Sequence, residues 1–504
     1  MASSRIPAAA TAQAPARAQG RGKPETRDDD GPASAGVTGK LMLAAGVSAI
    51  SGLLYGYDTG IISGALLQIR KAFHTGSGME QVIAASILLG AVLGALFCSR
   101  LSERVGRRRT ILLIACVFVL GALASALAPS AVTLSLGRIV LAVGGGTQTV
   151  PMYVAELAPP KHRGRLVLTF QMAIGGGIVI ATIVGATEAV SWRVSIGSAA
   201  VPAMAMLLLM LRLPESPRWL VKRDERDAAR DVLLEIRPAG WDVEPELREI
   251  VGLEESERDV GEKCRGWSGL RRDWIRPALL VGCGIAVFTQ LSGIEMIIYY
   301  APTILTNNGF STSAALRVSV GLGVTYLIMM IVGLAIVDRV GRRRLTLTMI
   351  PGAALSLAVL GALFVTHNSG RGSTPFIIAC LIVFMFFNAG GLQLMGWLTG
   401  SEIYPLAVRG AGTSAQAATL WSTNLLITLT LLTMINAIGV GATMWVYAGF
   451  NVAAFIFVLR RMPELTGRSL EQIEGRLREG RFRPQDFERV RSEPATVGRA
   501  AATG

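Results

Sequence analysis

One acidic side chain lies in the middle of a long apolar stretch near the start of the chain. Asp58 belongs to the segment Tyr55-Gly-Tyr-Asp-Thr-Gly60, within an apolar run from Leu41 to about Ile69 that can cross a bilayer as a helix. A carboxylate at that depth costs roughly 2.5–3.5 kcal/mol on insertion scales, and it usually faces water or a cationic partner. We therefore expect Asp58 to have a function.

The charged residues well inside apolar stretches are Asp58, Arg138 and Glu295. A guanidinium beside a carboxylate favours its charged form, whereas dry surroundings favour the protonated form. Alternate exposure of an Asp58–Arg138 pair to wet and dry surroundings would shift that balance, as proton coupling requires. We predict this role for the two residues. A purely structural pair, or an arginine that snorkels to the membrane interface, would also fit the sequence.

Polar and aromatic side chains in other apolar stretches form a second set of candidates. Amide groups both donate and accept hydrogen bonds, which suits a ligand rich in hydroxyl groups. An indole ring can stack on a sugar face and donate from its N–H. We predict ligand contacts from this set, although each member would also fit a contact between helices. The set consists of Gln171, Gln290, Tyr299, Trp397, Trp421 and Asn424.

The composition places these residues in an all-α membrane protein. Of 504 residues, 51% are hydrophobic and 17% are charged, with a mean hydropathy of +0.48, which excludes an ordinary soluble domain and a disordered chain. The net charge is +14, but the basic residues lie in loops and tails beside apolar segments. The positive-inside rule explains this pattern, so we expect a lipid bilayer and no nucleic acid as partner.

Twelve apolar segments are long enough to span a bilayer, and each is predicted to be a helix because backbone groups in hydrocarbon must be paired internally. Arginine-rich connections alternate with short connections that carry few cations. This predicts a multi-pass protein of the cell membrane with both termini in the cytoplasm. The predicted spans are 41–66, 79–101, 110–128, 131–157, 166–187, 194–213, 277–304, 316–337, 345–366, 375–400, 412–435 and 440–459.

Several motifs occur twice along the chain. The run Arg104-Val-Gly-Arg-Arg-Arg109 returns at 339–344, Glu156-Leu-Ala-Pro159 returns as Glu402-Ile-Tyr-Pro405, and Pro214-Glu215 returns as Pro463-Glu464. Such a duplication predicts two pseudo-symmetric six-helix bundles, with a ligand site between them that opens alternately to each side.

The predicted organisation has five parts. The first is rich in Ala, Arg and Pro and lacks a short apolar core with a cleavage site, so no signal peptide is expected. In the third, Ala228, Val232, Leu233 and Ile236 recur at helical spacing, which favours short amphipathic helices over a flexible linker. The parts are a disordered N-terminal tail (1–36), an N-terminal bundle (37–213), a cytoplasmic linker (214–275), a C-terminal bundle (276–462) and a cytoplasmic C-terminal tail (463–504).

Glu156 and Glu402 stand at equivalent points of the two halves. We predict that they pair with arginines from neighbouring span ends, among them Arg107 and Arg342, in salt bridges that keep the cytoplasmic side closed while the site opens outward. The alternative is that these arginines only set the topology.

Other motifs point away from catalysis and cofactors. The five cysteines have no paired spacing and the three histidines lie in predicted loops, so we expect neither a disulfide framework nor a metal site. Without an HExxH motif or a nucleophile–base set, we expect no enzyme, and no cofactor besides the proton as coupling ion. Glycine runs at 144–146 and 175–177 lack a preceding strand and a P-loop lysine, which favours close helix packing.

At these motifs the chain resembles the sugar porter family of the major facilitator superfamily, which includes bacterial sugar/proton symporters and animal glucose facilitators. The resemblance runs from about Gly46 to Glu474 and is strongest at Gly56–Gly60, at 151–159, at 214–220, at 290–302 and at 463–470. It implies rocker-type alternating access, with Asp58 as the proton-coupling residue and Arg138 as its partner. The sugar-site positions that it implies are Gln171, Gln290, Tyr299, Trp397 and Trp421, and the cytoplasmic gate is Glu156, Arg163, Glu402 and Arg409.

The chain departs from the family pattern within the implied sugar site. Glutamines that the pattern expects are replaced by Ile178, Thr289 and Leu420. The Gly-Pro pair that the pattern expects before Trp397 is replaced by Gln393-Leu-Met-Gly396. Glu295 stands where asparagine is usual. An ionised Glu295 would accept several ligand hydroxyl groups or meet a cationic group, and a neutral one would behave like an amide, so we predict a ligand contact.

The sequence therefore predicts a monomeric, proton-coupled symporter of a monosaccharide or polyol. An uncoupled facilitator and a membrane sugar sensor that does not transport are the alternatives, and substrate-induced proton uptake separates them from a symporter.

Overall fold

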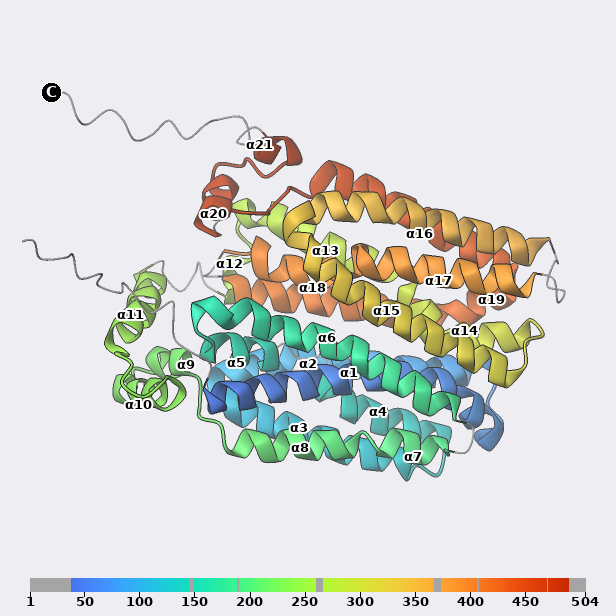
Figure 1. The fold of residues 1–504 in the computed structure, drawn as a ribbon, viewed down its shortest axis with the longest axis horizontal. Coiled ribbons are helices and arrows are strands. Elements are labelled where there is room, and N and C mark those ends of the chain that lie inside the picture. The colour runs from blue at the N-terminus through green and yellow to red at the C-terminus, as the bar shows by residue number, and fades with distance from the viewer. Residues whose placement is uncertain are drawn as a thin grey trace, which may run out of the picture.

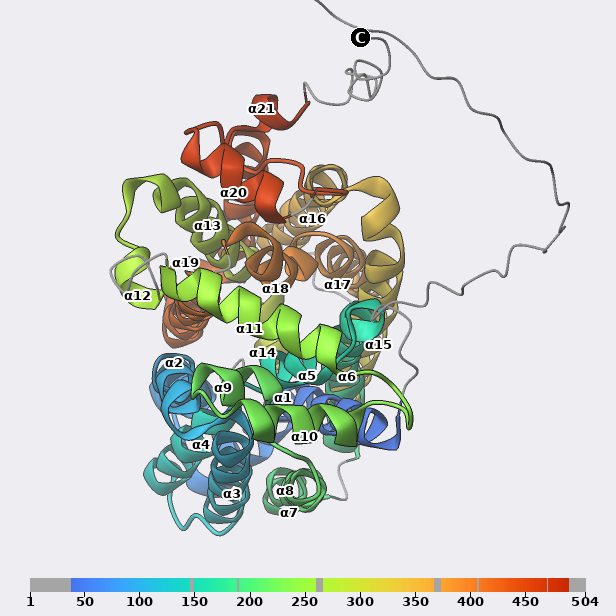
Figure 2. The same cartoon turned by 90° about the vertical axis from the view of Figure 1, so that its left-hand side faces the viewer.

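Helices are the only regular elements in the part of the chain that the structure describes. The computed structural model describes residues 38–145, 149–187, 190–259, 266–366, 373–405, 408–468 and 470–488. The helices form two bundles that lie side by side, with short helices gathered at one end (Figure 1, Figure 2). The tail predicted at 1–36 lies outside the described residues.

The helices of the N-terminal bundle approach each other closely at glycines. A Cβ on Gly56 would lie 1.9 Å from the carbonyl oxygen of Ile174, and a Cβ on Gly177 would lie 2.3 Å from that of Leu53. The prediction that the 175–177 run serves helix packing is confirmed at Gly177. The helices of this bundle are α1 (Gly39–Phe73), α2 (Ser77–Val105), α3 (Arg107–Ala126), α4 (Ala131–Gly145), α5 (Thr149–Leu157), α6 (Pro160–Ala186), α7 (Trp192–Gly197) and α8 (Ala200–Leu211).

The C-terminal bundle repeats this plan with two helices broken near the middle of their spans. Gly293, with φ of +94°, separates the first two helices of the bundle, and Gly391 separates α17 from α18. The helices are α13 (Arg276–Leu291), α14 (Ile294–Asn307), α15 (Thr312–Val340), α16 (Arg342–Val365), α17 (Thr374–Gly390), α18 (Leu392–Ile403) and α19 (Arg409–Arg461).

The repeated Val-Gly-Arg motif makes the same turn in both bundles. Gly106, between α2 and α3, has a φ of +108°, and Gly341, between α15 and α16, has a φ of +98°. Glycine adopts this region without strain, so the motif fixes where each helix ends. We call the end of the bundles that carries these two turns the basic end, and the opposite end the far end.

Ten stretches of the described residues are helical, long and apolar enough to cross a membrane. One of them is α19, in which Gly439 has non-helical angles, with φ of 83° and ψ of 161°. The chain reverses there, so α19 contains both spans predicted at 412–435 and 440–459. The predicted span 131–157 corresponds to α4 and α5, on either side of residues 146–148, which lie outside the described residues.

Short helices connect the bundles at the basic end; the first two pack against the N-terminal bundle, and the third packs against those two (Figure 2). The Thr38 hydroxyl donates to the carbonyl oxygen of Ile236 over 2.8 Å, and buried Arg237 donates to that of Leu157 over 2.9 Å. The predicted amphipathic helices are confirmed, with Leu233 and Ile236 on the buried face. The connecting elements are α9 (Pro217–Lys222), α10 (Arg226–Ile236), α11 (Glu244–Asp259), α12 (Gly266–Gly269) and η3 (Asp273–Ile275).

Two short helices after the last span, α20 (Leu470–Arg478) and α21 (Pro484–Glu488), also lie at the basic end. Phe487 is buried there, with the guanidinium of Arg468 4.8 Å and that of Arg476 5.2 Å from its ring centroid. The predicted C-terminal tail is therefore folded as far as it is described.

Candidate functional site

Asp58 and Arg138 meet inside the N-terminal bundle. Asp58 lies on α1 and Arg138 on α4, and Arg138 Nη1 is 3.6 Å from Asp58 Oδ1. Both side chains are withdrawn from solvent, with exposed fractions of 3% for Asp58 and 0% for Arg138. At this depth opposite charges stabilise each other more strongly than in water. The predicted contact is present, and its role in proton coupling stays a prediction.

The Asp58–Arg138 contact is loose. Asp58 Oδ2 and the Nε, Nη1 and Nη2 atoms of Arg138 have no hydrogen-bond partner among the described residues. A structural ion pair in a protein interior needs good geometry and further hydrogen bonds to offset the desolvation of its charges. Buried charges that lack those bonds are more typical of a functional group than of a structural bridge.

A small cavity connects Asp58 with the other bundle. It has a volume of about 20 Å³, and its lining includes Tyr55 and Asp58 of α1, Tyr299 of α14 and Trp421 of α19. A cavity of this size holds about one water molecule. The candidate proton site and two candidate ligand residues therefore face one space, which must widen before a sugar can enter.

Three aromatic rings meet where the bundles face each other. Trp421 lies 5.9 Å from Trp397 and 5.2 Å from Tyr55 between ring centroids, and Tyr55 lies 6.5 Å from Trp397. All three pairs have the edge-to-face geometry that aromatic rings favour. Trp421 Nε1 has no partner among the described residues, so it can donate to a ligand. No role was predicted for Tyr55, although it precedes Asp58 by three residues and shares its helix face.

Tyr299 and Asn424 lie at the same boundary. Tyr299 lies close to Asn424 in its own bundle and to Thr59 in the other. Asn424 Oδ1 accepts from the Thr428 hydroxyl over 3.2 Å, whereas Asn424 Nδ2 has no partner in the described part of the chain. Thr59 was missed because a threonine in an apolar helix carries no distinct signal.

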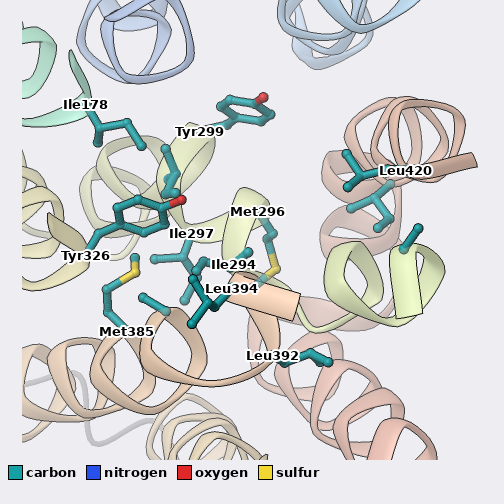
Figure 3. Close-up of a cluster of buried hydrophobic side chains, with 14 of the residues drawn as sticks. Ile178, Ile294, Met296, Ile297, Tyr299, Tyr326, Met385, Leu392, Leu394 and Leu420 are labelled. Atoms are coloured by element: carbon teal, nitrogen blue, oxygen red, sulfur yellow. The ribbon is translucent and has the colours of Figure 1, made fainter. Parts of the chain in front are cut away.

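The two predicted glutamines are buried in opposite bundles. Gln171 lies on α6 and Gln290 at the end of α13, and the Oε1 atom of each is unpaired within the described ranges. Buried amide oxygens are nearly always paired, so both are suited to accept a hydrogen bond from a ligand. Ile178, which replaces a glutamine of the family pattern, is buried on α6 among apolar side chains (Figure 3).

Glu295 lies in the first turn of α14, just after the break at Gly293. Its exposed fraction is 3%, and its carboxyl group lies close to Tyr299 and Gln393. The helix N-terminus favours negative charge, which partly offsets the burial of the carboxylate. The structure thus places Glu295 beside a predicted ligand residue.

The predicted salt bridges at the basic end are formed, but each lies within one bundle. Arg107 binds Glu156 through both Nε and Nη2, at 3.2 Å in each case. Arg342 binds Glu402 in the same bidentate way, at 3.1 Å and 2.7 Å. In this conformation the two pairs therefore brace each bundle separately instead of joining one bundle to the other.

Two further glutamates complete these networks. Glu215 Oε1 accepts from the backbone N–H groups of Arg107 and Arg108 over 2.8 Å and 2.9 Å, and Glu464 Oε1 accepts from that of Arg342 over 2.9 Å. Both carboxylates cap a helix N-terminus, where negative charge is favourable. The repeated Pro-Glu pair was the sequence signal for these caps, but it was used only to identify the duplication.

The remaining predicted gate residues are Arg163 and Arg409. Arg409 Nε donates to the carbonyl oxygen of Tyr404, in the same bundle, over 3.3 Å. Arg163 belongs to α6, but its side chain lies outside the described residues.

The chemistry available at the bundle boundary is hydrogen bonding, ring stacking and proton exchange. No group of three or more His, Cys, Asp or Glu side chains in the described ranges could hold a metal ion. Unpaired amide, carboxyl and indole groups from both bundles converge there instead, a combination that suits a polyhydroxylated ligand.

Known proteins resemble the chain over nearly its whole described length. The family model described as "Sugar (and other) transporter" matches residues 44–477. The D-xylose transporter of Levilactobacillus brevis is 37% identical over 436 residues, which cover 85% of this chain and 94% of that protein. The major myo-inositol transporter IolT of Bacillus subtilis (strain 168) is 36% identical over 444 residues, which cover 86% and 93%.

A solved structure shares the fold. The proton:xylose symporter XylE, bound to 6-bromo-6-deoxy-D-glucose, matches with a TM-score of 0.72 and 26% identity, over 86% of this chain and 98% of that one. XylE is a protein of E. coli. The likeness confirms the expected twelve-helix, two-bundle architecture and a multi-pass membrane protein. With the family match, the relatives and this fold together, the chain belongs to the sugar porter family of the major facilitator superfamily.

Proposed function

We propose that the protein is a secondary active transporter that carries a monosaccharide or polyol together with a proton. The cavity that Asp58 shares with Tyr299 and Trp421 carries this proposal, because it lets a proton site and a ligand site act on each other directly. The names of the relatives support the substrate class, since they include a D-xylose and a myo-inositol transporter, and a neighbouring structure is named as a proton:xylose symporter.

The coupling follows from the position of α1. Protonation of Asp58 removes the charge that attracts Arg138, so the two side chains can separate, whereas loss of the proton draws them together. Because α1 also carries Tyr55 and Thr59 at the bundle boundary, such a shift changes the ligand contacts. Thermodynamic linkage makes this effect reciprocal. If protonation of Asp58 strengthens ligand binding, then ligand binding favours the protonated form of Asp58 to the same extent.

Loading requires the bundles to move. The cavity of about 20 Å³ is too small for a monosaccharide. Each bundle is braced internally at the basic end by its own bidentate arginine–glutamate pair, so each can move as a unit. Rocking of two such units about a site between them would expose that site to one side of the membrane at a time.

Transport by Asp58→Asn in proteoliposomes tests the coupling. The substrate is first found by thermal-shift screening of purified protein against hexoses, pentoses, inositols and acyclic polyols, since a ligand of the folded state raises its apparent stability. We expect the variant to lose accumulation against a gradient and to retain counterflow exchange, because an amide cannot carry the proton but can still pack beside Arg138.

An Asp58→Asn variant that still concentrates substrate with normal pH dependence would place coupling elsewhere. Transport by the unmodified protein without substrate-induced proton uptake would identify an uncoupled facilitator. If the unmodified protein binds a ligand but shows neither accumulation nor counterflow exchange, it is a sensor.

A further inference from the structure

A groove of about 450 Å³ opens on the surface of the N-terminal bundle, where α2, α3 and the end of α4 meet. Its volume falls within the range of small-molecule sites, roughly 300–1,000 Å³. Figure 2 shows these three helices on one side of the bundle, with α12 near α2. Among the described residues, the groove shares no lining side chain with the cavity beside Asp58, so the candidate site between the bundles does not account for it.

The walls of the groove are apolar and open to the surroundings. Phe97 of α2 and Leu113 of α3 line it and have exposed fractions of 61% and 51%. Buried Ile114 lies deeper in the same groove. Both helices are long and apolar enough to cross a membrane, so these side chains face lipid chains. Such a surface can take up an apolar chain without leaving a polar group unpaired.

Two arginines stand where the groove approaches the basic end. Phe97, Arg100 and Arg104 follow one face of α2 at intervals of three and four residues, and Arg104 comes just before the turn that defines the basic end. Both arginines are exposed, and neither forms an ion pair with a described residue. The described lining of the groove contains no carboxylate. Glu103 points instead toward the C-terminal bundle, where its Oε1 would lie 3.9 Å from a Cβ on Gly410.

Arg100 is held at a point where the N-terminal bundle meets the linker. Its guanidinium carbon lies 5.1 Å from the ring centroid of Trp267 in α12. Trp267 in turn packs against an apolar cluster that includes Val408 and Ala411, beside the start of α19. A guanidinium over an aromatic ring is fixed in direction and still has N–H donors to offer, in the fork geometry that matches a phosphate.

The duplicated half of the chain lacks one of these arginines. The repeated motif aligns Arg104 with Arg339 of α15, and the same offset aligns Arg100 with Ala335, which is also exposed. The retention of positive charge at the basic end explains one arginine in each half. It does not explain Arg100, which lies one helical turn further from that end, at a depth where a charge is costly without a partner.

We propose that the groove binds an anionic phospholipid from the leaflet at the basic end. One acyl chain lies along the apolar walls, and the phosphate accepts hydrogen bonds from Arg100 and Arg104, with Trp267 as a positioning residue for Arg100. Charge complementarity favours this occupant, because the two arginines attract a negative headgroup. A second copy of the protein bound through the same face would bring the arginines of both copies together. The inference is independent of the proposed function, since it concerns lipid binding and not transport.

Quenching of a tryptophan in the groove wall by brominated lipids tests the site. The full-length Phe97→Trp variant is placed in phosphatidylcholine vesicles with rising fractions of brominated phosphatidylglycerol or brominated phosphatidylcholine, and the signal of the unmodified protein is subtracted. We expect a preference for phosphatidylglycerol of about tenfold or more, from two arginines near a membrane surface. Val332→Trp, at the equivalent point of α15, is the matched control; with one arginine nearby, its preference should be about fivefold or less.

Changes at the arginines should act only on the groove. Arg100→Gln should lower the preference at the Phe97→Trp position to that of the control, and Arg100→Gln with Arg104→Gln should remove most of what remains. Trp267→Leu should cause a smaller loss, because Arg100 then keeps its charge and loses only its orientation. The preference measured with Val332→Trp should stay constant in all three backgrounds, whereas a general structural change would move both signals.

Equal preferences at the two tryptophan positions, or a groove preference that survives Arg100→Gln, would overturn the site. The lipid would then respond only to the general positive charge of the basic end. Failure of both brominated lipids to quench the Phe97→Trp signal, while both quench the Val332→Trp signal, would also overturn it. That result would show that something other than lipid, such as a second copy of the chain, covers the groove.

Discussion

Arg138 is a fully buried arginine that meets the carboxylate of Asp58 only loosely. Arg138 has an exposed fraction of 0%, and its guanidinium meets Asp58 at 3.6 Å without hydrogen bonds to the described residues. Such a pair contributes little to stability as a whole, yet each member needs the other to offset its own desolvation. The two residues are therefore coupled energetically even where they touch only loosely.

Removal of Arg138 alone should destabilise the protein. Arg138→Leu leaves the Asp58 carboxyl buried without a cation, and breaking a buried pair in this way typically costs about 3–5 kcal/mol. The double variant Arg138→Leu with Asp58→Asn should recover most of that loss, because no charge is then left unpaired. Thermal unfolding of the purified variants measures both. A double variant as unstable as the single one would show that Arg138 stabilises the fold through packing and not through Asp58.

At the scale of single residues, the sequence predicts which charged residues are functional better than it predicts which side chains are in contact. Asp58, Arg138 and Glu295 could be predicted because a charge in an apolar helix is costly and therefore informative. Thr59 and Gln393 could not, because their importance depends on which residues of other helices they reach. Side-chain chemistry is local, whereas the partner of a side chain is decided by tertiary packing.

The close approach of α1 and α6 is the element-scale feature on which the Asp58 site depends. Two neighbouring glycines of α6 differ sharply in their surroundings: a Cβ on Gly177 would lie 2.3 Å from the carbonyl oxygen of Leu53, whereas a Cβ on Gly176 would have no atom within 4 Å. Small residues let helix backbones pack at this distance in a membrane, where apolar burial does not hold helices together.

Gly177→Ala should therefore destabilise the protein and Gly176→Ala should not. We expect Gly177→Ala to cost about 1–3 kcal/mol, as overpacking does, because a backbone carbonyl cannot move aside as a flexible side chain can. Gly176→Ala should be neutral or slightly stabilising, since alanine favours the helix by up to about 1 kcal/mol. Unfolding midpoints of the two variants, measured side by side in one detergent, provide the test. Equal midpoints would contradict the tight α1–α6 contact.

The sequence predicted where the helices lie better than it predicted where they end or break. Apolar length predicted each span, because the bilayer requires it. The break at Gly439 inside α19 matches the gap between two predicted spans, but the breaks at Gly293 and Gly391 fall within single predicted spans. Hydropathy cannot register such breaks, because it averages over a window longer than the break itself.

At the scale of the whole molecule, hydrogen bonds join the bundles at the far end, whereas the bidentate ion pairs of the basic end stay within each bundle. The Thr433 hydroxyl of α19 donates to Gln81 Oε1 of α2 over 3.2 Å, and Asn436 Nδ2 donates to the Ser77 hydroxyl over 3.4 Å. The duplicated motifs predicted two bundles but not this asymmetry, since Gln81 and Thr433 lie outside every repeated motif.

Loss of the far-end hydrogen bond between Gln81 and Thr433 should favour the conformation that opens there. Such a bond contributes about 0.5–1.5 kcal/mol, so Gln81→Leu with Thr433→Val should raise the population of that state by roughly two- to tenfold. Spin labels at Gly78, near the start of α2, and at Ala437, near the break at Gly439 in α19, are exposed and would report the change as a longer distance. Thr430→Val is the matched control, because the Thr430 hydroxyl bonds only within α19, to the carbonyl oxygen of Leu426 over 2.7 Å and more weakly to that of Ile427. An unchanged distance distribution in the double variant, with the control equal to the unmodified protein, would show that contacts other than the Gln81–Thr433 hydrogen bond hold the far end closed. A ligand that binds more tightly to the opened state should then gain affinity by the same factor as the population shift, which ties the geometry of the far end to the site between the bundles.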